Sequence, residues 1–217
     1  MRTVAVLPVK TFSRAKQRLS EAVGELDRSD LAAAMVADVL EALASVQALE
    51  AVIVVTAEPL AAEAAEAVGA VVVHDPEEAG QSAAAMRGIA AARERGAERV
   101  LAVPGDCPAL DPGEVGALLA RESRPGVVIV PDRHGSGTNA LLLAPPGAVA
   151  PSFGVGSFAR HAALARAAGA AIRVARLPSL ELDVDTPEDL AALRDALSAT
   201  TGARRTRAVL GGLPVAR

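Results

Sequence analysis

The sequence predicts an α/β domain built around a parallel sheet, and two observations support this. Short aliphatic runs alternate with longer segments in which apolar residues recur every three or four positions, the pattern of strands followed by helices. One run, Val100–Val103, has no polar alternation and stops at Pro104 and Gly105, which is typical of a strand buried on both faces. Asp106 follows directly, so we expect it at the carboxyl end of a central strand, where such sheets bind ligands.

The composition limits the classes of partner. Hydrophobic residues make up 51% of the 217, but the only aromatic residues are three Phe, so base stacking on single-stranded nucleic acid is not expected. The net charge of −4 argues against nucleic-acid and membrane-surface partners. Cys107, the only cysteine, is interpreted as a buried structural thiol rather than a nucleophile. One cysteine and no signal-peptide pattern predict a cytoplasmic protein.

Residues Thr3–Val9 predict the first strand, and a basic loop follows it. Of 22 basic residues only two are lysines, and both lie in this loop, as Lys10 and Lys16, together with Arg14 and Arg18. Ammonium and guanidinium groups at a strand end suit the phosphates of a nucleotide. A solvated basic loop is the alternative. The loop matches neither the P-loop nor the dinucleotide-binding glycine pattern.

The next segments continue the alternation of helices and strands. We expect helices over Arg28–Val46 and Pro59–Val68, strands over Ala51–Val55 and Ala70–Val73, and a helix from Gly80 to about Arg95. Gly80 lets the backbone approach a flat ligand, and Gln81 and Ser82 offer donors and acceptors to a base or a ribose. An ordinary helix start with Ser82 as the cap is equally compatible with the pattern.

The second half of the chain carries two glycine-rich loops. Its expected elements are a helix over Asp111–Arg121, strands over Gly126–Val130 and Ala140–Leu143, a helix from Ser157 and an edge strand over Ile172–Leu177. The first loop, residues 131–139, contains Arg133 and Thr138. The second, residues 152–157, exposes backbone N–H groups at a helix start and so predicts an anion site. A flexible loop with Ser157 as a plain cap is the alternative.

An acidic pair precedes the last predicted helix. Thr186 and Asp189 form a capping box there. Asp183 and Asp185 come just before it, on alternating sides of an expected strand end, so one of them can face the crevice. We choose Asp185 as the second metal carboxylate beside Asp106, and a solvated strand end is the alternative.

The last part of the chain loses the periodicity of the rest. No helical or strand pattern is visible after residue 197. We therefore predict a domain over residues 1–197 and a poorly ordered tail over residues 198–217.

Five segments together resemble one family of nucleotidyltransferases. In chain order they read L-P-V-K-x-F-x-x-A-K-x-R-L, P-G-D-C-P-A-L, P-D-R-H-G-S-G-T-N-A-L, F-G-V-G-S-F-x-R-H and L-D-V-D-T-P-E-D-L. They span Leu7 to Leu190 and are similar to the guanylyltransferases of coenzyme F420 biosynthesis. The resemblance implies a GT-A-type, Rossmann-like α/β/α fold of three layers with a mixed, mostly parallel sheet. Gln81-Ser82 departs from the family pattern, which has Leu-Asn.

The resemblance also implies roles for individual residues. Catalytic residues would be Lys10, Lys16, Arg18 and Asp106, with the three cations on the leaving diphosphate. Nucleotide contacts would come from Pro8, Val9, Lys10, Gly80, Gln81, Ser82 and Gly105. Thr138, Gly154 and Ser157 would hold the acceptor, and Arg133, from the composition of its loop, would pair with the acceptor carboxylate. Mg²⁺ would bind Asp106 and Asp185, with Asp183 the alternative to Asp185.

The implied reaction transfers GMP from GTP to phosphoenolpyruvate, or to 2-phospho-L-lactate or 3-phosphoglycerate, and releases diphosphate. The product would pass to the next transferase of the pathway. Two rival functions are a glycosyltransferase that uses Asp183 and Asp185 as its D-x-D motif, and a nucleotide-binding subunit without turnover. The late position of the acidic pair argues against the first, and the retained lysines and carboxylates argue against the second.

Overall fold

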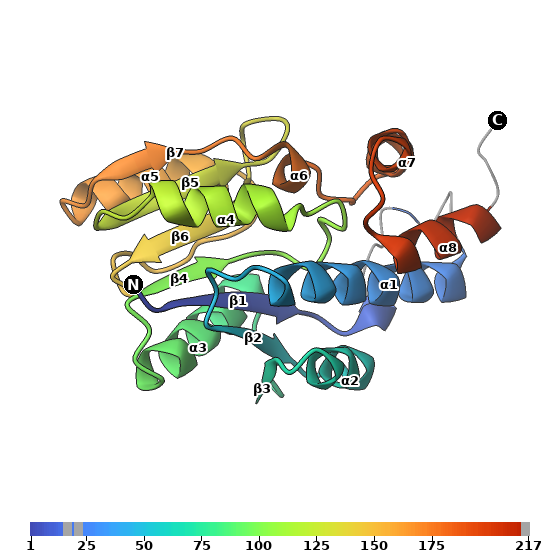
Figure 1. Cartoon of the computed structure of the whole chain (residues 1–217), viewed down its shortest axis with the longest axis horizontal. Coiled ribbons are helices and arrows are strands. Elements are labelled where there is room, and N and C mark those ends of the chain that lie inside the picture. The colour runs from blue at the N-terminus through green and yellow to red at the C-terminus, as the bar shows by residue number, and fades with distance from the viewer. Residues whose placement is uncertain (15–18, 20–23, 214–217) are drawn as a thin grey trace.

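The strands form one mixed sheet. The computed structural model describes residues 1–14, 19 and 24–213, and within them seven strands follow the order β3-β2-β1-β4-β6-β5-β7 (Figure 1). Their bounds are β1 Thr3–Val9, β2 Ala51–Thr56, β3 Val71–His74, β4 Arg99–Ala102, β5 Gly126–Pro131, β6 Thr138–Ala144 and β7 Ile172–Val174. Only β6 runs against its neighbours, β4 and β5, so the predicted mixed, mostly parallel sheet is confirmed.

Helices cover both faces of this sheet. Their bounds are η1 Phe12–Arg14, α1 Glu25–Ala44, α2 Pro59–Ala67, α3 Gln81–Glu94, α4 Pro112–Arg121, α5 Ser157–Ala167, α6 Pro178–Glu181, α7 Pro187–Ser198 and α8 Arg204–Gly212. Aliphatic residues of α1, α2 and α4 form one core with one face of the strands. Those of α3 and α5 form a second core with the other face (Figure 1). The three-layer α/β/α prediction is confirmed, and Val, Leu and Ala fill both cores.

Two glycines allow helices to approach the central strands. A Cβ added at Gly88 of α3 would overlap the side chains of Val6 and Val55. One added at Gly105 would lie 2.9 Å from Cγ2 of Val36 in α1. The absence of a side chain at Gly105 therefore lets α1 pack beside the end of β4, at the edge where a ligand is expected.

The direction of β6 decides which residues share that edge. The parallel strands β1 and β4 both end there, at Val9 and Ala102. Because β6 pairs antiparallel with β4, its first residue, Thr138, lies at the same edge. Asp106 and Thr138 therefore come to one side of the sheet although 32 residues separate them in the sequence.

Two local predictions in the second half are corrected. The edge strand β7 covers only Ile172–Val174 instead of continuing to Leu177. The acidic pair does not follow a strand, because residues 178–181 form α6 and residues 182–186 have no regular structure. Pro178 at the helix start and the capping box of α7 at Thr186 divide this stretch into short pieces. The capping box itself is confirmed.

The prediction of a poorly ordered tail is also corrected, because residues 204–212 form α8, which packs on α1 (Figure 1). Asp38 of α1 accepts hydrogen bonds from the backbone N–H groups of Arg205 (3.2 Å) and Thr206 (2.7 Å), as a cap does at a helix start. Leu210 and Leu213 are buried in a third cluster with leucines of α1 and α7. The capping carboxylate is 168 residues from Thr206, so no local sequence pattern reveals it.

Parts of the predictions concern residues that lie outside the described chain. Lys16 and Arg18 belong to these, so their placement stays a prediction. Among the described residues, no helix combines the length and hydropathy needed to cross a membrane.

Candidate active site

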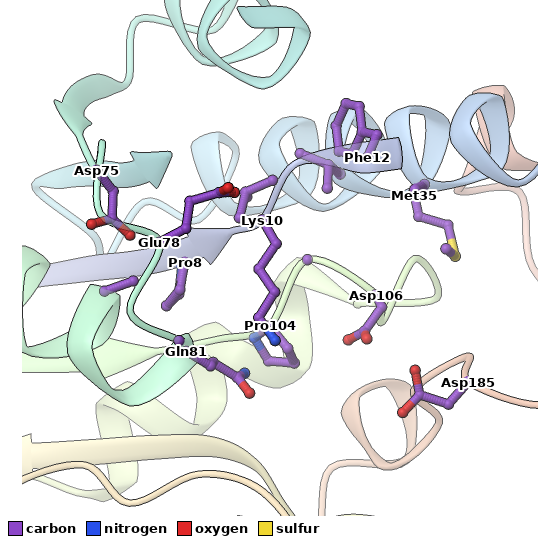
Figure 2. A pocket seen from close by; sticks show the side chains of 16 residues that line it. Pro8, Lys10, Phe12, Met35, Asp75, Glu78, Gln81, Pro104, Asp106 and Asp185 are labelled. Carbon is purple, nitrogen blue, oxygen red and sulfur yellow. The ribbon is translucent and has the colours of Figure 1, made fainter. Parts of the chain in front are cut away.

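A cleft opens at the carboxyl ends of β1 and β4 (Figure 2). Sixteen residues line it: Pro8, Val9, Lys10, Phe12, Ala32, Met35, Val36, Asp75, Glu78, Gly80, Gln81, Ala84, Pro104, Gly105, Asp106 and Asp185. One wall comes from α1 and the opposite side from the start of α3. The structure therefore brings together most residues that the sequence assigns to the nucleotide and the metal.

Asp106 and Asp185 face each other across this cleft (Figure 2). They come from segments 79 residues apart, which a backbone hydrogen bond joins: the N–H of Val184 donates to the carbonyl of Asp106 at 3.1 Å. The capping box adds a second restraint, because the N–H of Asp185 donates to Asp189 Oδ2 at 3.0 Å. The two carboxylates are thus presented by fixed backbone.

Asp183 is not among the residues that line the cleft. Asn139 Nδ2, at the start of β6, donates to Asp183 Oδ1 at 3.2 Å and to the carbonyl of Leu180 at 2.8 Å. Burial, followed by the negative charge of Asp106, raises the pKa of Asp183 to about 6. The negative charges of Asp106 and Asp185 thus both disfavour the ionised form of Asp183.

The start of the basic loop is held by two acidic side chains. Glu78 accepts hydrogen bonds from the backbone N–H of Thr11 (2.9 Å) and from its hydroxyl (2.5 Å). Glu58, which also caps α2, accepts one from the N–H of Phe12 at 2.9 Å. Lys10 precedes this anchored turn and extends into the cleft from the end of β1 (Figure 2). These hydrogen bonds restrain the backbone directly after Lys10.

Arg160 organises the second glycine-rich loop. Its guanidinium donates to the carbonyls of Ser152 (3.0 Å), Phe153 (3.1 Å) and Val155. Gly154 lies in this loop with φ +105°, a backbone conformation that L side chains rarely adopt. The N–H groups of Ser152, Phe153 and Ser157 already donate within the protein, to His161, to Ser82 and to the carbonyl of Gly154. The anion site that the sequence predicts for this loop therefore stays a prediction.

Thr138 and the start of this loop meet at one buried imidazole. Thr138 Oγ1 lies 3.0 Å from His161 Nδ1, and the N–H of Ser152 donates to His161 Nε2 at 2.8 Å. Burial, aided by the charge of Arg160, lowers the pKa of His161 to about 4, so the ring is neutral at pH 7. Ser157 follows the loop as the first residue of α5 and is buried.

Two predicted site residues make contacts other than the expected ones. Ser82 does not cap α3, whose N-cap is Gly80, and its hydroxyl instead accepts the N–H of Phe153 at 2.9 Å. Arg133 pairs with Asp189 of the capping box at 2.5 Å. Their predicted contacts with the nucleotide and with the acceptor carboxylate stay predictions, and neither contact is favoured by this geometry.

Four candidate functional residues are not predicted from the sequence. Asp75 and Glu78 line the cleft after β3, and Arg160 and His161 hold the loop before α5. Glu78 has a φ of +41°, which is uncommon for a residue other than glycine and marks a tight turn. The only sequence signal was the appearance of Arg160 and His161 in F-G-V-G-S-F-x-R-H, which does not disclose their partners.

Comparisons with known proteins agree with this architecture. The family model described as "Guanylyl transferase CofC like" matches residues 3–197. A protein of Conexibacter woesei named phosphoenolpyruvate guanylyltransferase is 52% identical over 216 residues, covering 98% of this chain and 97% of that protein. One of the same name from Sphaerobacter thermophilus is 40% identical over 190 residues, covering 88% and 91%.

Solved structures share the fold at low sequence identity. A putative nucleotide-diphospho-sugar transferase from Desulfovibrio desulfuricans has a TM-score of 0.77 at 18% identity, covering 98% of this chain and 95% of its own. A nucleotidyl transferase from Methanothermobacter has a TM-score of 0.65 at 19% identity, covering 92% and 99%. The family match over nearly the whole chain, together with full-length relatives, shows that the chain belongs to the CofC-like guanylyl transferases and is a nucleotidyltransferase.

Proposed function

We propose that this protein transfers GMP from GTP to phosphoenolpyruvate, forming enolpyruvyl-diphospho-guanosine and diphosphate. The observation that carries the proposal is the cleft that Lys10 after β1, Asp106 after β4 and Asp185 before α7 line together. Cations for a triphosphate and carboxylates for a divalent ion are what transfer of a nucleotidyl group needs. Relatives at 52% and 40% identity carry the name of this activity.

The residues present fit a Mg²⁺ ion. Hard oxygen donors suit this ion, and proteins usually bind it through one or two carboxylates plus the phosphates of a substrate. Among the described residues, no group of three or more acidic, His or Cys side chains could hold a metal ion. Binding through two carboxylates and the phosphates of a substrate is compatible with this. Asp106 and Asp185 would hold the ion, which when bound neutralises charge on the α-phosphate and the acceptor.

The chain's own residues mainly position the reactants. An oxygen of the acceptor phosphate attacks the α-phosphorus of GTP, and the bond from that phosphorus to the bridging oxygen of the diphosphate breaks. A phosphate oxygen is already ionised at neutral pH, so no general base is required. Lys10 stabilises the negative charge that develops on the departing diphosphate. Catalysis then consists of alignment and charge neutralisation.

Guanine would lie in the part of the cleft that α3 and the segment after β3 form. Gly80, with φ +107°, lets the backbone approach a flat base, and Gln81 lies beside it in the cleft lining. Asp75, also in the lining, offers a carboxylate to the amino group of guanine, which is a hydrogen-bond donor.

The acceptor would lie between Thr138 and the loop that contains Gly154, with Ser157 at its far end. Phosphoenolpyruvate carries a phosphate and a carboxylate on three carbons, which suits a compact set of hydroxyl and N–H donors. The hydrogen bond from Phe153 to Ser82 ties this loop to the first turn of α3, beside the nucleotide cleft. The two substrates would therefore lie against adjoining parts of one framework.

Diphosphate release tests the proposal. The protein is incubated with Mg²⁺, GTP and, in separate arms, phosphoenolpyruvate, 2-phospho-L-lactate and 3-phosphoglycerate. We expect the highest kcat/KM with phosphoenolpyruvate, and a faster rate with another acceptor would replace that substrate. ATP, CTP and UTP serve as controls for the base. Thermal stabilisation by a nucleotide sugar and not by GTP would favour a glycosyltransferase instead.

A further inference from the structure

A buried imidazole that the reaction does not use joins the two elements of the acceptor site. His161 of α5 is fully buried. It contacts Thr138 on one side and the backbone of Ser152 on the other. The ring of Phe153 meets it edge to face, with the centroids 5.2 Å apart. These contacts fix the orientation of the ring, so each nitrogen has one defined neighbour.

The contacts also fix where the proton of the ring lies. A backbone N–H can only donate, so His161 Nε2 must accept from Ser152 and carry no proton. The neutral ring has one proton, which therefore lies on Nδ1. Nδ1–H then donates to Thr138 Oγ1 at 3.0 Å.

This tautomer determines what the Thr138 hydroxyl can do. A hydroxyl has one proton to donate, and here one of its lone pairs is already occupied by His161. Among the described residues, no second hydrogen-bond partner of Thr138 Oγ1 is found, so its proton is available to a ligand. Thr138 begins β6, at the edge where β4 also ends.

We propose that His161 is a positioning residue that makes Thr138 an obligatory hydrogen-bond donor to the anionic acceptor substrate. The proton on Nδ1 keeps the Thr138 hydroxyl from turning toward the core, and Nε2 holds the start of the 152–157 loop against the same ring. One side chain thus aligns both parts of the acceptor site. The inference rests on the proposed function, because it needs an anionic acceptor at Thr138.

A double-mutant cycle tests this inference through the KM of phosphoenolpyruvate. Thr138→Val, which removes the hydroxyl, is expected to raise this KM at least tenfold, the loss of a hydrogen bond to a charged group. His161→Gln places an amide oxygen near the position of Nε2 and so keeps an acceptor for Ser152, but it loses the donor to Thr138. We expect it to raise the same KM at least fivefold, with the KM of GTP within twofold of wild type.

The double variant separates positioning from a merely structural role. If His161 acts through Thr138, the KM of the double variant equals that of Thr138→Val. If the two single effects multiply instead, the inference is wrong. His74→Gln, at an exposed histidine of β3, is the matched control and is expected to keep the wild-type KM.

A second measurement needs neither a variant nor a substrate. Long-range ¹⁵N–¹H correlation spectra of the histidine rings at pH 7 report the tautomer of His161, and we expect the neutral form with its proton on Nδ1. A proton on Nε2, or a charged ring, would overturn the inference even if every variant fails to fold. Absence of diphosphate release by the wild-type protein would instead refute the proposed function, and the assignment of the acceptor to Thr138 with it.

Discussion

The two halves of the sheet, on either side of β4, differ in what they offer a ligand. The half with β1, β2 and β3 is parallel, and its cleft presents charged side chains from strand ends. The half with β6, β5 and β7 contains the antiparallel strand, and there the exposed Arg160 and the buried His161 hold a loop. In the first half the sequence places ligand groups directly, whereas in the second it places the residues that orient them.

The difference has a physical reason. A triphosphate with a divalent ion needs strong, opposite charges, and these are available only from side chains. A small acid needs several donors at short range, which backbone N–H groups supply without the entropy cost of ordering long side chains. Backbone donors are useful only when the loop is rigid, so the second half needs buried polar supports.

The largest expected effect comes from Asp106, the charged centre of the first half. Asp106→Asn should lower kcat about a thousandfold, roughly 4 kcal/mol of transition-state stabilisation. The fold should stay intact, because the amide has the same shape. Steady-state kinetics at saturating Mg²⁺ measure the effect, and thermal unfolding monitors the fold.

Asp111→Asn is the matched control for Asp106. Asp111 caps α4 five residues further on, and an asparagine caps equally well. The control should keep the wild-type kcat. A near-normal kcat in the Asp106 variant would remove the carboxylate from the proposed reaction.

The second prediction concerns pH and the supports of the other half. His161 has a folded-state pKa of about 4 against an ordinary value of 6.5, so the unfolded chain binds more protons between these values. The free energy of unfolding therefore falls as the pH falls through this window, by about 2 kcal/mol between pH 7 and pH 5 from this group. In the His161→Gln variant, this part of the pH dependence of the unfolding free energy should be absent.

Urea unfolding of both proteins at pH 7 and pH 5 measures the difference. Asp183, with a pKa of about 6, contributes a slope of opposite sign, but it is present in both proteins and cancels in the comparison. If the unfolding free energies of the two proteins changed equally between pH 7 and pH 5, the pKa of His161 would be the same in the folded and the unfolded protein.

The parts of the molecule that follow from the sequence are those whose causes lie close together in the chain. The end of β4 at Ala102, shortly before Asp106, and the capping box at Thr186 each depend on neighbours within a few residues. The contact of Phe153 with Ser82 joins residues 71 positions apart, and that of Arg133 with Asp189 crosses from a loop to a helix start. Such long-range partners leave no periodic or local signal.

The third prediction tests the lysine of the first half. Lys10→Ala should raise the KM of GTP or lower kcat about tenfold, close to 1.4 kcal/mol, because a charge-assisted contact with the phosphates is lost. Arg204→Ala is the control, since this arginine pairs with Glu41 on the surface of α8 and α1. Equal GTP kinetics for the two variants would leave Lys10 as a solvated charge.

The smallest expected effect is that of Ser82→Ala, which tests whether Ser82 serves the nucleotide cleft or the acceptor loop. The sequence assigns Ser82 to the nucleotide, whereas its hydroxyl accepts a hydrogen bond from Phe153 in the acceptor loop at 2.9 Å. Ser82→Ala removes that bond, worth about 1 kcal/mol, or roughly a fivefold change. If the loop contact is its role, the KM of phosphoenolpyruvate rises by this factor and that of GTP stays constant. A rise confined to the KM of GTP would return Ser82 to the nucleotide site, and the boundary between the halves would then lie one turn further along α3.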